Sequence, residues 1–354
     1  MPTAALMRGA TAALRPWMTY PAWTAMGLIL LATALLSPQM VARIAPYPFL
    51  FSLVFLGLPH GAWDHRVVAA AGGRHLSLRH LMAVCTIYLV LVALYGVLWL
   101  AAPTPAFVLF IVISWLHWGQ GDAAYLHLWS PVPAGPPSWL TWLVRGGAPI
   151  LLPVFRFPEE FARIASGVTG LFGPARAADW LPPPWVRGGG LLLLALLAAA
   201  YGILLFRAFR RGSGSDRTAA REDAAEVALL YLVFSVANPV LAVGIYFCVW
   251  HGLRHIGRLL LLDTRNRALC AEGRVAAAGT RFGGQCLPIL LASLGLLAGA
   301  YGWAVRDSSG TPDGLFVYLA LISCLTFPHF LLVCWLDFRQ NRRKQDKMSP
   351  RSHR

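Results

Sequence analysis

Residues 80–102 read HLMAVCTIYLVLVALYGVLWLAA, and no residue after the first is charged. About 20 apolar residues in a helix are enough to cross the hydrocarbon core of a bilayer. Comparable runs recur along the chain, at about residues 22–43, 47–63, 105–128, 139–155, 188–207, 225–262, 285–305 and 314–337. The sequence therefore predicts an all-α protein, built as a polytopic transmembrane helical bundle.

The composition supports this interpretation, because the chain is short of charge. Of its 354 residues, 57% are hydrophobic and 13% are charged, and the mean hydropathy is +0.59. A soluble domain usually carries about 25% charged residues. The composition excludes a soluble enzyme, a secreted disulfide scaffold and a disordered chain. We expect a single integral-membrane domain over 1–354, with polar cytoplasmic tails at 1–20 and 339–354.

The formal net charge is +15, from 30 basic and 15 acidic residues. In a soluble protein this excess would suggest nucleic acid, but here the basic residues fall between apolar runs. Basic connections mark the cytoplasmic side of a membrane protein. We therefore expect the lipid bilayer as partner, no nucleic acid, and a multi-pass location in the cell (inner) membrane.

The run 225–262 is too long for one crossing and is interrupted at Asn238-Pro239. Proline removes a backbone donor and disfavours helix in the residue before it. Dividing the run into about 225–237 and 240–262 brings every basic connection to the cytoplasmic side. The sequence then predicts nine or ten membrane segments with the C-terminus inside.

Seven of the ten histidines lie within or at the ends of apolar runs, namely His60, His65, His117, His127, His251, His255 and His329. Ionisable groups at membrane depth are costly and are usually functional. For His329 we expect a structural or pocket-lining role. His65 and His127 are candidates for handling protons or for contacting metal ligands.

His251 and His255 are four residues apart, in the sequence WHGLRH at 250–255. On a helix this spacing places both imidazoles on one face, a turn apart, where they can bind one metal ion. The alternative is that each ring only forms hydrogen bonds with neighbouring helices.

His60 begins a second motif, within GLPHGAWDH at residues 57–65. Asp64 follows it by four residues and could accept the N–H of a ligand imidazole. Alternatively, Asp64 and His65 mark a helix end at the membrane surface.

His117 lies near the middle of its apolar run, in SWLHWGQGD at residues 114–122. An unpaired polar ring is costly there, so it is either a ligand or a hydrogen-bonded core histidine. Gln120 and Asp122 are candidates for orienting it or for binding water.

Together, the four neutral imidazoles of His60, His117, His251 and His255 suit iron, zinc or copper rather than magnesium or calcium. A metal site buried in a membrane most simply acts on a lipid-soluble molecule. We assign no catalytic residue beyond the ligands.

The order of these motifs, with Asn238-Pro239 leading into WHGLRH, resembles the Brp/Blh family of membrane β-carotene 15,15'-dioxygenases from about residue 45 to 340. The resemblance implies an Fe(2+) cofactor held by His60, His117, His251 and His255. It implies that dioxygen cleaves the central double bond of β-carotene to give two molecules of retinal. The implied product would also connect the protein functionally to a retinal-binding rhodopsin.

The sequence is also compatible with two other functions. One is a membrane di-iron desaturase or hydroxylase, because His60 to His65 and His251 to His255 resemble two of its histidine boxes, although the chain has no His-His dipeptide. The other is a non-enzymatic protein that binds or transports carotenoid or retinal. Iron stoichiometry tests the first alternative, and pigment binding without cleavage tests the second.

Overall fold

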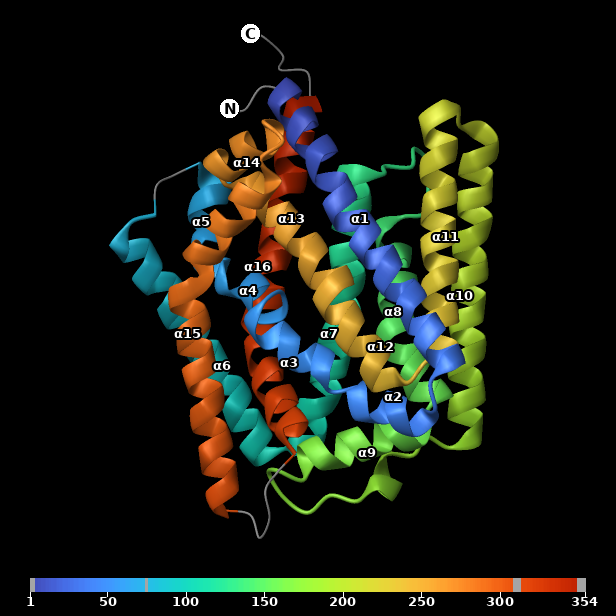
Figure 1. Cartoon of the computed structure of the whole chain (residues 1–354), viewed down its shortest axis with the longest axis vertical. Coiled ribbons are helices and arrows are strands. Elements are labelled where there is room, and N and C mark those ends of the chain that lie inside the picture. The colour runs from blue at the N-terminus through green and yellow to red at the C-terminus, as the bar shows by residue number, and fades with distance from the viewer. Residues whose placement is uncertain (1–3, 74–75, 308–312, 349–354) are drawn as a thin grey trace.

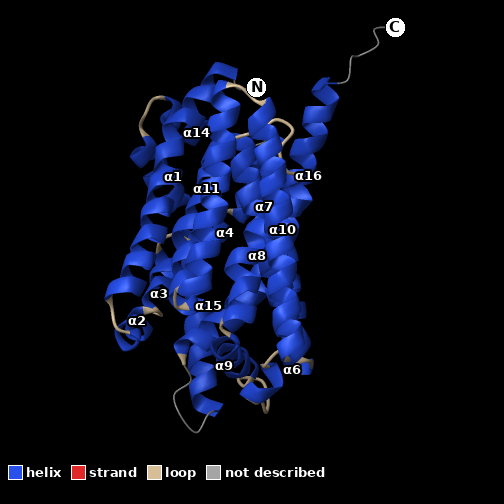
Figure 2. Ribbon diagram, turned by 90° about the vertical axis from the view of Figure 1, so that its right-hand side faces the viewer, coloured by secondary structure: helices blue, strands red, loops and turns tan. Residues whose placement is uncertain are grey.

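The structure is a computed structural model of the whole chain, and it describes residues 4–73, 76–307 and 313–348. These residues form helices and connecting loops without a strand (Figures 1 and 2). The all-α class expected from the sequence is therefore confirmed for the described part of the chain.

The elements of the first half are α1 (Ala4–Leu35), α2 (Pro38–Ile44), α3 (Tyr47–Val54), α4 (Gly57–Ala62), α5 (Asp64–Gly72), α6 (Leu78–Ala101), α7 (Pro103–Trp129), α8 (Ser138–Arg156) and α9 (Pro158–Thr169). The second half has the short 3₁₀ turn η1 (Ala177–Trp180), α10 (Pro184–Arg211), α11 (Gly214–Val236), α12 (Pro239–Ile245), the π-helical turn η2 (Tyr246–Gly252), α13 (Leu253–Leu262), α14 (Thr264–Ala271), α15 (Val275–Asp307) and α16 (Gly314–Met348).

Within the described residues, seven helical stretches are long and apolar enough to cross a membrane. They are Ala4–Leu35, Pro38–Gly72, Leu78–Ala101, Pro184–Arg211, Pro239–Leu262, Val275–Gly302 and Gly314–Gln340. The protein is therefore a multi-pass membrane protein. Helices α7, α8 and α11 are not among the seven, so the predicted nine or ten membrane segments are not confirmed.

The break predicted at Asn238-Pro239 is present. Helix α11 ends at Val236 and α12 begins at Pro239. The Asn238 side chain caps the new helix by accepting a hydrogen bond from the Leu241 backbone N–H at 3.1 Å, as asparagine does at helix N-termini. Proline at the first helical position costs nothing there, since its missing N–H would have no partner.

The sequence did not predict how far residues 38–72 are fragmented. The expected span at 47–63 is divided into the short helices α3 and α4, and α5 begins only two residues after α4 ends. The residues on either side of each break therefore belong to separate short helices. This has consequences for Asp64, described below.

The first turns of α1 and the last turns of α16 lie at the same end of the bundle (Figures 1 and 2). Helix α14 and the connection between α10 and α11 are at that end too, while α9 lies at the other end (Figure 1). Of the expected polar tails, residues 4–20 belong to α1 and residues 339–348 to α16. Residues 1–3 and 349–354 lie outside the described part.

The stretch Pro239–Leu262 is the most deeply buried of the seven candidate spans. It runs as α12, η2 and α13 without interruption and packs against α1, α3 and α7. A helix enclosed by protein can carry polar side chains that lipid would not tolerate. The fold therefore encloses this helix in protein, where its polar side chains can form a binding site.

Helices α7 and α8 form the most extensive helix pair, and glycines allow their close approach. A Cβ atom built on Gly119 would lie 2.1 Å from the Trp142 carbonyl oxygen, and one on Gly146 would lie 2.1 Å from that of Trp115. No side chain fits at either distance. Small residues at such crossings let helix backbones pack against each other inside membranes.

Candidate metal centre

The four histidines singled out from the sequence come together inside the bundle. They lie on four different elements: His60 on α4, His117 on α7, His251 on η2 and His255 on α13. All four are buried. The ring centroid of His60 is 5.4 Å from those of both His251 and His255, and that of His117 is 4.8 Å from His251.

A π-helical turn presents His251. Residues 246–252 adopt this wider turn, which is rare and often occurs at functional sites. The imidazole stacks against the rings of Trp118 and Phe247, at centroid distances of 5.7 and 6.3 Å. It also lies against Gly121, where a Cβ atom would be 3.1 Å from the ring carbon Cε1. These contacts hold the ring in one orientation.

His60 is presented by α4, which is only six residues long. Its Nδ1 donates to the Leu56 carbonyl oxygen at 3.3 Å, because a carbonyl can only accept. The other nitrogen, Nε2, then carries the lone pair that a metal requires. The backbone of the preceding turn thus selects the tautomer.

His117 is oriented through a chain of polar side chains. Its Nδ1 lies 3.4 Å from Oε1 of Gln120, whose Nε2 donates to Asp337 at 2.8 Å. Asp337 in turn pairs with Arg258. Gln120 thus contacts the ring that it was predicted to orient, and the orienting role stays a prediction. Asp337 and Arg258 were not identified from the sequence, although both are charges near the ends of apolar runs.

Several ring nitrogens of the cluster have no hydrogen-bond partner although they are buried. These are Nε2 of His117, Nε2 of His251 and both nitrogens of His255. A buried polar atom without a partner costs about 1–3 kcal/mol. A bound metal ion would satisfy such nitrogens, and imidazole is the preferred donor for iron, zinc and copper. The residues present therefore fit a metal ion.

The structure adds His329 to this cluster. Its ring lies 4.8 Å from that of His117 and 5.0 Å from that of His60. Taking one nitrogen from each residue, His60, His117 and His329 form a group whose members are all within 4.8 Å of one another. The sequence suggested only a pocket-lining or structural role for His329.

Asp64 differs from its sequence-based interpretation. It was expected to face His60 four residues earlier, but α4 ends before it and α5 begins with it. The two residues are thus on separate short helices, and both lie against His329. The Asp64 carboxylate instead accepts hydrogen bonds from Nδ1 of His329, at 2.6 Å, and from the hydroxyl of Tyr88.

His65 and His127 do not join the cluster. Nδ1 of His65 donates to the Ala62 carbonyl oxygen at 2.8 Å. His127 is exposed on α7, and its Nε2 lies 3.1 Å from the Ser138 hydroxyl. Neither contact connects them to the clustered imidazoles.

Asp122 was a candidate for orienting His117, but its hydrogen bonds go to other side chains. Its carboxylate accepts hydrogen bonds from the indole N–H of Trp250 at 3.0 Å and from Nε of Arg145 at 2.9 Å. Arg254 lies 3.4 Å from it. Asp122 therefore anchors the helix that carries His251 and is not hydrogen-bonded to a clustered histidine.

Asp122 belongs to a buried ionic cluster of five side chains, which are Asp122, Arg145, Asp223, Glu226 and Arg254. Two guanidinium groups thus face three carboxylates. Arg254 is also sandwiched between the rings of Tyr125 and Trp250, each 3.9 Å from its central carbon. The sequence did not predict this cluster, although four of its five charges lie within apolar runs and Asp223 lies just before one. It joins α7, α8, α11 and α13.

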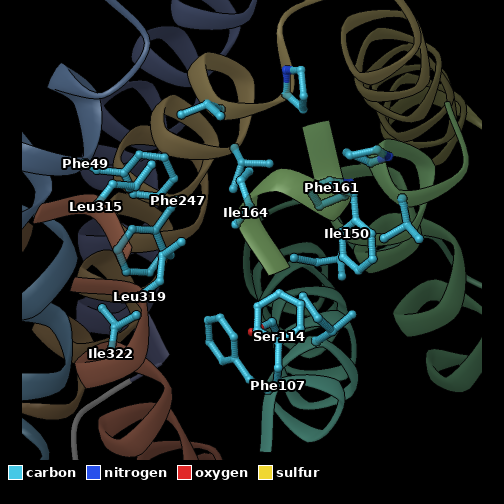
Figure 3. Close-up of a pocket in the computed structure, with 18 of the residues that line it drawn as sticks. Phe49, Phe107, Ser114, Ile150, Phe161, Ile164, Phe247, Leu315, Leu319 and Ile322 are labelled. Atoms are coloured by element: carbon cyan, nitrogen blue, oxygen red, sulfur yellow. The ribbon is translucent and has the colours of Figure 1, made fainter. Parts of the chain in front are cut away.

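An apolar cavity of about 980 Å³, including its open mouth, lies beside the histidines. Figure 3 shows side chains from several helices around it, among them Phe107, Ile164 and Leu319. Phe247 and Trp118 form part of its wall and stack against His251 on their other side. Two aromatic rings therefore separate the cavity from His251, and the apolar lining suits an apolar ligand.

Comparison with known proteins places this site in context. Residues 51–337 match the family model described as beta-carotene 15,15'-dioxygenase. A probable beta-carotene 15,15'-dioxygenase, Blh, of Halobacterium salinarum is 37% identical over 89% of this chain and 90% of its own length. A second protein of that organism, named probable beta-carotene 15,15'-dioxygenase Brp, is 28% identical over 82% of both chains.

A protein of an uncultured marine bacterium, named beta-carotene 15,15'-dioxygenase, is 26% identical over 57% of this chain and 65% of its own length. No solved structure matches the chain. The family model covers all five clustered histidines, from His60 to His329. On these grounds, the chain belongs to the beta-carotene 15,15'-dioxygenase family.

Proposed function

We propose that this protein is an Fe(2+)-dependent enzyme that cleaves the central 15,15' double bond of β-carotene with dioxygen. The products are two molecules of all-trans-retinal. The observation that carries the proposal is the convergence of buried imidazoles with unpartnered nitrogens beside an apolar cavity. The names of the relatives agree with it.

His60, His117, His251 and His255 would hold the metal. Iron(II) would supply the capacity to react with dioxygen, and each retinal receives one of the two oxygen atoms, so no external reductant is required. The residues of the chain orient the ligands. The Leu56 carbonyl selects the tautomer of His60, and Gln120 contacts Nδ1 of His117.

The cavity supports a long apolar substrate. Its wall is made of aliphatic and aromatic side chains such as Phe49, Phe161 and Leu315 (Figure 3), with few polar groups. Burial of apolar surface contributes about 25 cal/mol per Å², so such a wall favours a hydrocarbon over a polar ligand. Such a wall would also keep water away from a metal held by the neighbouring histidines.

The substrate and product are lipid-soluble, which agrees with a site inside a membrane bundle. We place the enzyme in the cell (inner) membrane, where it would draw carotenoid from the bilayer. A retinal-binding rhodopsin in the same membrane would consume the product.

Expression in a bacterium that produces β-carotene tests the proposal. We expect the orange colour to fade and retinal to appear in extracts analysed by chromatography. The His251→Ala variant should leave the pigment unchanged and should bind no iron. Unchanged pigment with the wild-type protein, when membrane expression is confirmed, would refute the proposal. Iron near one atom per chain, rather than two, would exclude a di-iron site.

A further inference from the structure

His329 is the one member of the described histidine cluster that the proposed ligand set does not use. It stands on α16, more than 70 residues along the chain from His255, and only 5% of its surface is exposed. Its ring centroid lies 5.0 Å from His60, 4.8 Å from His117 and 5.2 Å from His255. The centroid separations within the set of four run from 4.8 to 6.3 Å, so the position of His329 gives no reason to exclude it.

The contacts of His329 define which of its ring nitrogens is available to bind a metal ion. Nδ1 lies 2.6 Å from Oδ2 of Asp64, and an ionised carboxylate can only accept, so Nδ1 carries the hydrogen. In a neutral imidazole Nε2 then holds the lone pair. That Nε2 is buried and has no hydrogen-bond partner, which is the condition also found for Nε2 of His117 and His251.

Asp64 has a second hydrogen-bond partner besides His329. The Tyr88 hydroxyl on α6 donates to the same carboxylate oxygen that His329 contacts. A histidine that binds metal commonly donates its second N–H to a carboxylate, which orients the ring and makes it a better donor. The arrangement of Tyr88, Asp64 and His329 has this form.

The competing interpretation is a charged pair between a protonated His329 and Asp64. In that case Nε2–H would be a buried donor without an acceptor, aimed into a group of imidazoles that offer it no bond in the structure. A positive charge would also stand beside the nitrogens that would hold a divalent cation, and like charges repel strongly when buried. The neutral form avoids both costs.

We propose that His329 is a fifth imidazole donor to the metal, and that Asp64 is the residue that positions it. This inference rests on the metal centre of the proposed function and enlarges its ligand set. It assigns Asp64 to a histidine 265 positions away. It also predicts that loss of His329 weakens metal binding directly.

The test uses full-length protein in detergent, stripped of metal and reloaded anaerobically with Fe(2+). Competition with a chelator measures affinity, and X-ray absorption counts the imidazole ligands. His329→Gln should lose one imidazole from that count and bind iron more weakly. Asp64→Asn keeps the size of the side chain and should weaken binding about 10–100-fold. The control His80→Gln changes an exposed histidine that contacts Ser77 and should match wild type.

Wild-type affinity together with an unchanged imidazole count in His329→Gln would overturn this inference. If His329→Gln fails to fold, Asp64→Asn decides, and wild-type affinity in that variant would also overturn it. These outcomes differ from failure of the proposed function. If the wild-type protein binds no iron, the whole metal centre is refuted, whereas a wild type that binds iron and releases retinal leaves only the fifth ligand in question.

Discussion

Replacing Arg145 with methionine tests the role of the buried ionic cluster. Its guanidinium is fully buried and pairs with Asp122 at 2.9 Å, with Asp223 at 2.7 Å and with Glu226. In the native cluster two positive charges face three negative ones, a net charge of −1. Arg145→Met leaves Arg254 alone against three carboxylates, a net charge of −2.

Removing one partner of a buried pair costs about 3–5 kcal/mol, because a charge is left without compensation. Since about 1.4 kcal/mol is a factor of ten, the ratio of folded to unfolded protein should fall roughly 10²–10⁴-fold. Equilibrium unfolding in mixed micelles with a rising fraction of denaturing detergent, followed by circular dichroism, measures this change. Adding Asp223→Asn restores a net charge of −1 and should recover part of the loss.

Arg163→Met is the matched control. Arg163 pairs with Glu160 on the exposed side of α9, where both side chains reach solvent. Exposed ion pairs contribute about 0–1 kcal/mol, so this variant should unfold nearly as wild type does. If Arg145→Met is no more destabilised than Arg163→Met, the cluster does not stabilise the fold as argued.

Three further changes test the site. Gln120→Leu removes the contact to His117 and should weaken iron affinity about 10–100-fold, measured by chelator competition. Gly121→Ala places a Cβ atom 3.1 Å from the His251 ring and should lower the rate of retinal formation by displacing it. Ile164→Trp fills part of the apolar cavity and should raise the KM for β-carotene while iron content stays at the wild-type level.

The last two of these changes each have a control on a helix that does not line the cavity. Gly27→Ala on α1 adds a methyl group where nothing lies within 4 Å, and Leu193→Trp adds bulk on an exposed face of α10. Both should retain wild-type kinetics. A Gly121→Ala enzyme as active as Gly27→Ala, or an unchanged KM in Ile164→Trp, would contradict the placement of ring and cavity.

Much of the site could be predicted from the sequence because the relevant signals are local. The spacing of His251 and His255 is a property of one helix, and the break at Asn238-Pro239 follows from the missing N–H of proline. The depth of His117 within its apolar run marked it as costly unless paired. These three expectations depend on neighbouring residues only, and the structure agrees with the burial and clustering that they imply.

Other features could not be predicted in this way. The sequence suggested that Asp64 contacts His60, on the assumption that one helix covers residues 57–65. In the structure the helix is interrupted at Trp63, and Asp64 contacts His329. The predicted number of segments also exceeded the seven candidate spans found in the described residues. Apolar runs identify helices, but length and apolarity alone do not separate a crossing from a helix enclosed by protein.

The sequence by itself determined the membrane class and the helical fold, and it singled out four of the clustered histidines, because scarcity of charge and the burial of polar groups in apolar runs are readable along the chain. Only the tertiary structure decided that His329 joins them, that Asp64 serves His329, and that Arg145 gathers three carboxylates. The physical reason is separation: the Asp64–His329 contact spans 265 positions and the Asp122–Trp250 contact spans 128. Hydrogen bonds and ion pairs at such distances are set by helix packing, and local periodicity carries no information about them.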